Sequence, residues 1–384
     1  MPFYQKRGIV PSKRHTQMRD KSGMLYSEEL ISRNGFSGMY SNLYHMNPPS
    51  AVQKIGKYKN IKLSKVLDTH RPHHLETNDI NFDKDFFNKR VPLFFNDELV
   101  ISKSQLQNSS EKLFRNGVAD ELFFIHHGRG IFKSNFGQID ITPGDYLVIP
   151  KGTTYHVEVL EKIEALVIES SSPIETPERY RNKFGQLLEH SPFSERDIRT
   201  PTLMDPVSTK SIELDLKLKD SIQTYLYENH PFDLVGWDGY FYPYVFNIND
   251  FMPITGKIHQ PPPVHQTFKG AGFVICSFVP RLFDYHPNSI PAPYSHSNVD
   301  SDEIIYYVKG EFMSRKGIRE GSITHHPMGI PHGPQPGKTE ESIGKTKTDE
   351  FAVMIDTFTS LSTTKEAFDI EDKSYPYSWL KNDN

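Results

Sequence analysis

Two histidines and one glutamate between residues 296 and 332 have the types and spacing of a metal-binding site. His296 and Glu303 flank a short polar turn, and His332 follows a segment that contains a Pro-x-Gly bend. Two imidazoles and one carboxylate can fill one face of a coordination shell and leave the other face open to O2 and a substrate, as in non-haem Fe(II) sites. The same ligands also suit Mn(II) and Zn(II), and spacing alone does not choose among these ions. The segment therefore predicts an open divalent-metal site at His296, Glu303 and His332.

Other polar residues near these three could assist the chemistry. On a strand, Asn298 would point the same way as the first histidine, and its neutral amide would be a poor ligand that leaves a further position open. His259 and His265 flank three prolines, and either could act as an acid or base, because an imidazole titrates near pH about 6.5. His326 lies shortly before the last ligand and could hydrogen-bond a ligand or the substrate. The choice between His259 and His265 stays open at this point.

Two histidine pairs lie outside this region. His73 and His74 have no carboxylate or cysteine at metal-ligand spacing, and we expect them in a surface loop. His126 and His127 occupy consecutive positions of a strand-like segment, and consecutive side chains of a strand point to opposite faces. We therefore expect that these two histidines do not face one barrel together.

The elements that must position the candidate ligands occur twice along the chain. Glu121 begins a Glu-x6-Gly frame that Glu303 repeats, and Gly144 begins a Gly-x5-Pro-x-Gly frame that Gly321 repeats. Each pair of frames predicts a strand that ends in a turn at glycine, followed by a strand that returns through a Pro-x-Gly bend. The two halves of the chain should therefore form small β-barrels of one kind.

The two copies differ where the chemistry would take place. In the first copy, residues 116–121 contain no histidine, and Tyr155-His156 stand where the second copy has Pro331-His332. We therefore expect a degenerate, metal-free first barrel with a structural role and a catalytic second barrel.

The composition predicts a mostly β protein of two barrels. The chain has 28 prolines and 12% aromatic residues, and its apolar runs are short and bounded by turn residues, which does not fit a helical bundle. Residues 1–60 are rich in Gly, Pro, Tyr and Asn and should form an irregular N-terminal arm. We expect residues 1–200 to hold this arm and the degenerate barrel, and residues 201–384 to hold the catalytic barrel and a C-terminal tail.

Several classes of protein are excluded by charge and patterning. Acidic residues (48) slightly outnumber basic ones (44), so we expect no nucleic-acid partner and no anionic membrane surface. The single cysteine, Cys276, excludes an internal disulfide framework, and no apolar run suits a signal peptide or a membrane span. We expect a cytoplasmic protein that acts on a small molecule.

The motifs resemble those of a known family. The frames match the cupin pattern, His-x-His-x3,4-Glu-x6-Gly followed by Gly-x5-Pro-x-Gly-x2-His, with Asn298 in place of the second histidine. Over nearly its whole length the chain resembles the homogentisate 1,2-dioxygenase family, whose members are two-barrel cupins. The segments that carry the resemblance are Gly236-Trp-Asp-Gly239, Asn249-Asp-Phe-Met-Pro-Ile-Thr-Gly-Lys-Ile-His259, Tyr294-Ser-His296-Ser-Asn298 and Ile330-Pro-His332-Gly-Pro334.

The resemblance implies a role for each candidate residue. The Fe(2+) ligands carry over to His296, Glu303 and His332, and the acid/base histidine carries over to His259. The implied reaction is an extradiol-type ring cleavage, in which homogentisate and O2 give 4-maleylacetoacetate in tyrosine and phenylalanine catabolism. Members of the family assemble as hexamers, so a homo-oligomer is expected. The residues expected to contact the substrate are Tyr294, His326 and His332.

The chain departs from the family in two places, and other functions stay open. The spacing from the first histidine to Glu303 is one residue longer than in the animal enzymes, which the cupin pattern allows. Phe312 stands where those enzymes have a tyrosine, which leaves the anchoring of the substrate in doubt. The alternatives are another cupin ring-cleaving dioxygenase, such as one acting on gentisate, a two-barrel Zn or Mn sugar isomerase, or a non-enzymatic two-barrel cupin that binds a ligand.

Overall fold

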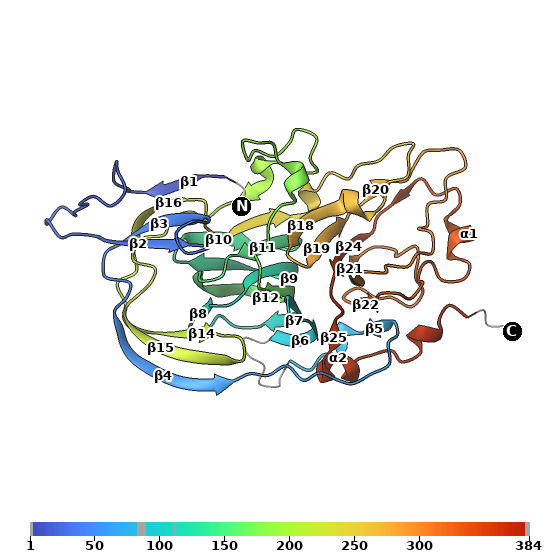
Figure 1. Cartoon of the computed structure of the whole chain (residues 1–384), viewed down its shortest axis with the longest axis horizontal. Helices are drawn as coiled ribbons and strands as arrows, with labels where there is room; N and C mark the ends of the chain where they lie inside the picture. The colour runs from blue at the N-terminus through green and yellow to red at the C-terminus, as the bar shows by residue number, and fades with distance from the viewer. Residues whose placement is uncertain (1–2, 83–89, 111, 381–384) are drawn as a thin grey trace.

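The computed structural model describes residues 3–82, 90–110 and 112–380, and most of their regular structure is β-strand (Figure 1). The prediction of a mostly β protein is therefore confirmed. Among these residues, no helix is long and apolar enough to cross a membrane. The helical elements are α1 (Lys338–Ser342), α2 (Lys365–Asp369) and the 3-10 turns η1 (Thr77–Asp79), η3 (Glu178–Tyr180), η4 (Glu195–Asp197), η5 (Ile248–Asp250), η6 (Pro262–His265) and η7 (Tyr375–Tyr377).

A large antiparallel-rich sheet forms the first barrel in the middle of the molecule (Figure 1). Its long strands β9 and β12 pair along most of their length, and apolar residues on both faces of this pair are buried. Phe123 and Val167 point into the barrel core, whereas Phe124 and Leu166 point into a second core outside it. Because successive side chains of a strand point to opposite faces, large apolar residues cover both faces of this sheet. Its strands are β4 (Val52–Asn60), β6 (Arg90–Phe95), β7 (Leu99–Leu106), β8 (Leu113–Asn116), β9 (Asp120–Ser134), β10 (Gly137–Ile141), β11 (Asp145–Ile149), β12 (Thr154–Ser170), β13 (Ile198–Arg199), β14 (Lys210–Lys217), β15 (Ser221–Asn229), β17 (Tyr244–Asn247) and β25 (Ser362–Thr363).

The second sheet carries the candidate ligands. Its strand order is β18-β19-β24-β21-β22-β5, and each neighbouring pair in this order is antiparallel. In this register Glu303 lies across from His326 on one side and from Asp356 on the other. The strands are β5 (His73–Leu75), β18 (Gln266–Gly270), β19 (Phe273–Phe278), β21 (Asp302–Lys309), β22 (Ile323–His326) and β24 (Phe351–Thr357), and a short pair β20 (Arg281–Leu282) and β23 (Lys347–Thr348) lies beside them.

One apolar core joins the two sheets. Tyr146 of the first sheet packs edge-on against Phe268 of the second, with ring centroids 5.4 Å apart. The Tyr146 hydroxyl lies 2.9 Å from Ser277 Oγ on β19, so its buried polar atom is satisfied across the same boundary. Phe124 and Tyr306 make a further aromatic contact, at 6.3 Å. These contacts hold the second sheet in a fixed position against the first.

The N-terminal segment is more regular than the sequence predicted. Residues 1–60, expected to be an irregular arm, include β1 (Gln5–Gly8), β2 (Ser27–Ser32), β3 (Tyr40–His45) and β4. The first three form a small sheet with β16 (Leu234–Gly239) (Figure 1). The fully buried Trp237 lies on β16. The strands β1 and β3 depend on β16, a partner far away in sequence, which local composition does not show.

Strand pairing crosses the expected domain boundary at residue 200. The strands β14, β15 and β17 follow that position yet belong to the large sheet, and β5 precedes it yet extends the second sheet. Near the C-terminus, β25 returns to pair with β6. The division of the chain into residues 1–200 and 201–384 stays a prediction. Strands from each of these two parts contribute to the sheet of the other part.

Candidate metal centre

The structure brings His296, Glu303 and His332 together. The two histidines form an antiparallel bridge, in which each backbone N–H donates to the other's carbonyl oxygen at 2.8 and 2.9 Å. Glu303 lies near the start of β21, with one carboxylate oxygen 3.5 Å from His332 Nε2 and the other 3.9 Å from His296 Nε2. One potential ligand atom from each residue lies within 4.8 Å of the other two. This spacing permits a single ion to contact all three side chains.

The donor atoms fit a divalent cation. His332 Nε2 is buried and has no hydrogen-bond partner among the described residues, which is a costly state for a polar atom. The Nδ1 atoms of His296 and His332 each lie 3.2 Å from the carbonyl oxygen two residues earlier in the chain. In a metal site, a partner at one ring nitrogen orients the other toward the ion. Both Nε2 atoms are therefore held near the Glu303 carboxylate.

His326 lies behind the glutamate. Its Nδ1 lies 2.8 Å from Glu303 Oε1, its Nε2 lies 3.0 Å from the Tyr375 hydroxyl, and its ring stacks on His332 at 4.5 Å. The ring is fully buried, and burial lowers its pKa to about 3, so His326 is neutral near pH 7. Because both nitrogens have protein partners, the geometry supports a role in orienting the carboxylate.

The charge of Glu303 is stabilised inside the protein. Burial opposes its ionisation, but the three imidazoles of His296, His326 and His332 around the carboxylate outweigh burial and hold the pKa of this carboxyl well below its usual range. A carboxylate that is already ionised needs no deprotonation before it binds a cation. Glu303 is thus prepared to act as the anionic member of the three.

The side of the site next to His296 is open. The His296 side chain is 31% exposed, whereas that of His332 is 1% exposed. Tyr294 packs edge-on near His296, with ring centroids 6.2 Å apart, and His259 lies 5.4 Å from Tyr294 on the outer side. His259 Nδ1 lies 3.0 Å from an oxygen of Asp284. The predicted acid/base histidine and the predicted pocket tyrosine therefore line one side of the opening.

His265 and Phe312 occupy buried or packed positions. His265 ends the turn η6, is 3% exposed and packs against Phe278 at 5.2 Å. Burial lowers its pKa to about 3, which suits a packed neutral ring more than a proton carrier at the open side. Phe312 packs edge-on against Tyr307 at 4.5 Å. Between the two histidines that the sequence left open, the geometry favours His259.

Asp356 is a further acidic residue in the site, which the sequence reasoning missed. It lies on β24 directly across from Glu303, and its Oδ1 is buried without a hydrogen-bond partner among the described residues. Burial and the negative charge of Glu303 raise its pKa to about 8. The short apolar run 351–355 is typical of a strand, but which residue of that strand faces Glu303 depends on the register of the pairing.

The C-terminal tail closes the rear of the site, and this too was missed. The turn η7 brings Tyr375 to His326, and the Trp379 indole N–H donates to the carbonyl oxygen of Gly333 at 2.9 Å. Arg315 is buried, donates to the same carbonyl oxygen at 2.6 Å and lies over the Trp379 ring. The turn that follows His332 is therefore fixed from two sides. The aromatic composition of the tail was the one signal in the sequence.

The first barrel has other residues at the corresponding places. Tyr155 stands where the second barrel has His332, and it pairs with Phe114 across β8 and β12 as His296 pairs with His332. The Phe114 and Tyr155 rings pack edge-on at 5.4 Å. Only the carboxylate position is kept, as Glu121 at the start of β9. Tyr155, and not His156, is therefore the structural counterpart of the last ligand.

In the first barrel, a buried arginine pairs with the acidic residues. Arg90 is buried and donates from Nη1 to both Glu121 and Glu169, and from Nη2 to the Tyr155 hydroxyl at 2.8 Å. Asn116 Nδ2 also donates to Glu169, at 2.8 Å. Buried carboxylates require such pairing, because an isolated buried charge is very unfavourable. Lys217 Nζ also pairs with Glu169, so Arg90 and Lys217 together balance the two acids of this barrel.

The expectation for His73 and His74 was wrong, because both are buried on the edge strand β5. His73 Nδ1 lies 2.6 Å from Glu371 Oε1, and its ring stacks on His325 at 5.4 Å. Arg71 donates two hydrogen bonds to the same Glu371 carboxylate. The Arg71 guanidinium therefore already pairs with the Glu371 carboxylate. Together, Arg71, His73 and Glu371 connect the C-terminal tail to the second sheet.

Comparison with known proteins identifies the relatives of the chain. A family model described as Homogentisate 1,2-dioxygenase N-terminal matches residues 96–248. The protein named "Putative dioxygenase SSO1533" of Saccharolobus solfataricus is 45% identical over 383 residues, which cover 99% of both chains. The Homogentisate 1,2-dioxygenase of Nitrobacter hamburgensis is 28% identical over 232 residues, which cover 58% of this chain and 50% of the relative. That of Bradyrhizobium diazoefficiens is 26% identical over 61% of this chain and 53% of the relative.

A solved structure of a cupin 2 conserved barrel domain protein from Leptotrichia buccalis aligns with 78% of this chain at 12% identity and a TM-score of 0.34. The fold and the ligand cluster define a two-barrel cupin with one candidate metal centre in its second barrel. The chain belongs to the homogentisate 1,2-dioxygenase family, a family of cupin dioxygenases. The match with the relatives that carry that name spans about half of their length.

Proposed function

We propose that this chain is an Fe(2+)-dependent dioxygenase that opens the ring of homogentisate with O2 to give 4-maleylacetoacetate, in tyrosine and phenylalanine catabolism. The observation that carries the proposal is the buried, unpartnered Nε2 atom of His332 beside His296 and Glu303. Family membership supports the dioxygenase class, and the relatives named homogentisate 1,2-dioxygenase support this substrate.

His296, Glu303 and His332 would hold the iron. Bound iron supplies a Lewis acid for substrate oxygens and a route for electron density from the aromatic ring to O2. The protein keeps His332 and Glu303 out of water and leaves the His296 side open, so the substrate would enter from that side. Tyr294 lies along the same entrance and would contact the ring of the substrate.

His259 would accept the phenolic proton of the substrate. Its Nδ1 is paired with Asp284, so its Nε2 is the ring nitrogen left to take up a proton. A carboxylate beside an imidazole stabilises the imidazolium that forms when the proton is taken up. Half of the His259 side chain is exposed at the entrance, where a small aromatic acid could reach it.

Oxygen uptake tests this function directly. The purified protein is loaded anaerobically with Fe(2+), mixed with homogentisate or gentisate, and followed by an oxygen electrode and by the absorbance of the ring-cleavage product. Oxygen consumption with homogentisate, and little with gentisate, is the expected result. Consumption with gentisate alone would assign the chain to the other ring-cleaving class, and none with either substrate would leave a non-enzymatic binding role.

Assembly and location are part of the proposal. The resemblance to the family leads us to expect a homo-hexamer, and light scattering of the purified chain would measure its mass. The buried thiol of Cys276, whose pKa burial raises well above its usual value, suits the reducing cytoplasm, where we place the reaction. Small-molecule partners are the aromatic acid and O2, with no nucleic acid and no membrane.

A further inference from the structure

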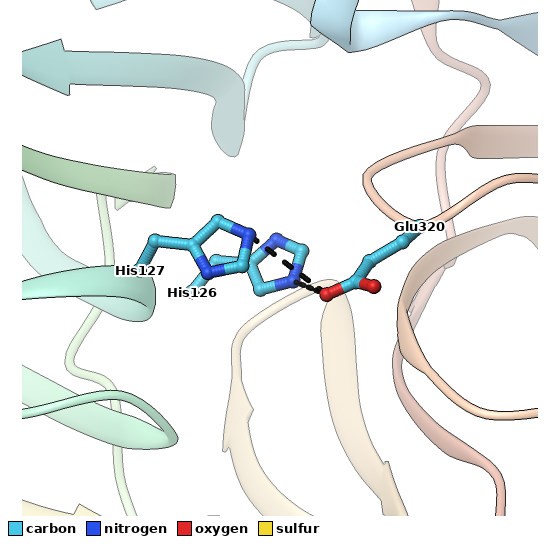
Figure 2. A group of neighbouring side chains, drawn as sticks. All are labelled: His126, His127 and Glu320. Carbon is cyan, nitrogen blue, oxygen red and sulfur yellow. Dashed lines mark hydrogen bonds and ion pairs between the residues drawn. The ribbon is translucent and has the colours of Figure 1, made fainter.

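Three side chains gather at the boundary between the two barrels, away from the site described above. His126 and His127 come from β9, and Glu320 comes from the loop that precedes β22 (Figure 2). Glu320 Oε1 lies 3.2 Å from His126 Nε2 and 3.8 Å from His127 Nε2. One potential ligand atom from each residue lies within 4.8 Å of the other two.

A bulge explains why both histidines face the same side. In the pairing of β9 with β12, His127 lies across from Glu164 and Ile125 lies across from Ala165, so His126 has no partner. An extra residue of this kind interrupts the alternation of side chains along a strand. The two imidazole rings stack at 4.1 Å with an interplanar angle of 16° (Figure 2). The expectation that the two histidines could not face one barrel side together was therefore wrong.

A backbone oxygen adds a fourth donor. The carbonyl oxygen of Val308 lies 2.9 Å from His126 Nε2. Strand β21 is itself irregular here, because its register against β24 shifts between Tyr307 and Lys309 and leaves Val308 without a partner. Without an ion, His126 Nε2–H donates to this oxygen. An ion in this place would take both atoms as ligands, with the ring proton moved to Nδ1.

The second nitrogen of His126 is held by the protein. Its Nδ1 lies 2.5 Å from the buried Tyr306 hydroxyl, which donates to it while Nε2 carries the ring proton, and the Tyr306 oxygen accepts from Lys103 Nζ. A partner at Nδ1 fixes the ring so that Nε2 points in one direction, as in protein metal sites.

We propose that His126, His127, Glu320 and the Val308 carbonyl oxygen form a Zn2+-class site that links the first barrel to the second. Imidazole nitrogens and carboxylate oxygens bind this ion at about 2.0–2.2 Å, which sets the edges of a tetrahedron at roughly 3.3 Å. The observed separations of 2.9, 3.2 and 3.8 Å lie around that value. The ion would connect β9 of the first barrel with β21 and the loop before β22 in the second, and so stabilise the two against each other.

A count of bound zinc in matched variants tests the site. The full-length protein and the variants His127→Gln, Glu320→Gln and His190→Gln are dialysed against Zn2+ and then against zinc-free buffer, and zinc per chain is measured. The proposal predicts one equivalent fewer in His127→Gln and in Glu320→Gln than in the wild type. His190 is exposed and lies outside the cluster, so His190→Gln should match the wild type.

The comparison with the wild type separates this ion from any ion held by His296, Glu303 and His332, which are intact in all four proteins. Added Zn2+ should also raise the unfolding temperature of the wild type more than that of the two cluster variants, because an ion that binds only the folded state stabilises it. His127 and Glu320 are about half exposed, so both variants should fold, and circular dichroism checks this. A folded His127→Gln or Glu320→Gln protein with the zinc content of the wild type overturns the proposal.

Discussion

In the first barrel, the guanidinium of Arg90 donates to the carboxylate of Glu121, the residue that corresponds to Glu303 in the second barrel. Across the sheet from Glu121 lies Glu169, just as Asp356 lies across from Glu303. In the described part of the chain, no arginine or lysine hydrogen-bonds to Glu303 or Asp356. The first barrel thus places Arg90 beside its acids. The second barrel instead places two acids, Glu303 and Asp356, beside the imidazoles of His296 and His332.

Replacing Arg90 should destabilise the fold. In Arg90→Met, the buried Glu121 would lose its cation, whereas Glu169 would keep Lys217, and the loss of one partner of a buried pair costs about 3–5 kcal/mol. Urea denaturation of the wild type and the variant would measure it. Arg129→Met is the control, since Arg129 pairs with Glu161 at the exposed surface and should contribute little. An equal effect of the two substitutions would contradict this account of Arg90.

Replacing the candidate ligands should remove iron without unfolding the chain. His332→Ala and Glu303→Ala each take away one of three donors, so both proteins should lose iron and oxygenase activity. The strands around them are held by the apolar cores, so the circular dichroism spectrum should stay close to that of the wild type. Metal analysis after reconstitution provides the measurement. Full iron content in His332→Ala would refute its assignment as a ligand.

Replacing His259 should slow the reaction and leave iron in place. His259→Ala removes the proposed acceptor of the phenolic proton, and general acid/base groups contribute roughly 10²–10⁴ to the rate. Asp284→Asn should lower kcat in the same direction but by less, because it only weakens the partner of His259 Nδ1. His265→Gln is the matched control, because that ring is packed away from the opening. A normal kcat in His259→Ala would move the acid/base role elsewhere.

Stability should fall at high pH because of His45. Burial alone would lower the pKa of this histidine, but hydrogen bonds with Asp233 and Glu29 raise it to about 9. Because the pKa of His45 is higher in the folded than in the unfolded chain, protonation of this ring stabilises the fold. The stabilisation is fully present below the pKa of about 6.5 in the unfolded chain, and it is lost as the pH rises through about 9.

The size of this effect follows from the shift, which corresponds to about 3 kcal/mol at most. The free energy of unfolding, measured from pH 6 to pH 10, should therefore decline more steeply in the wild type than in His45→Gln. Parallel pH profiles for the two proteins would show that His45 does not carry the effect.

Much of the site was predictable from residue types and spacing. His296, Glu303 and His332 are recognisable because metal ligands need particular donor atoms at separations that a strand, a turn and a returning strand can span. The repeated frames predicted two barrels, and short apolar runs bounded by turn residues predicted β-strands. These features are local, so a reader of the sequence can see them without knowing the fold.

The rest was decided by contacts between distant parts of the chain. Asp356 faces Glu303 and Arg90 faces Glu121 because of strand register, and a shift of one residue would turn each side chain to the other face. The N-terminal strands form because β16 offers them an edge. His126 and His127 share one side because of a bulge.

The sequence by itself therefore determined the candidate ligands His296, Glu303 and His332, and it showed that the frame around them recurs earlier in the chain. The tertiary structure alone decided which residues surround them, because pairing register and bulges depend on the packing of the whole core. It placed Arg90 among the acids of the first barrel and left His332 Nε2 without a partner in the second. The two barrels therefore differ in packing: the first has an arginine beside its acids, and the second has a donor atom that is free to bind a metal.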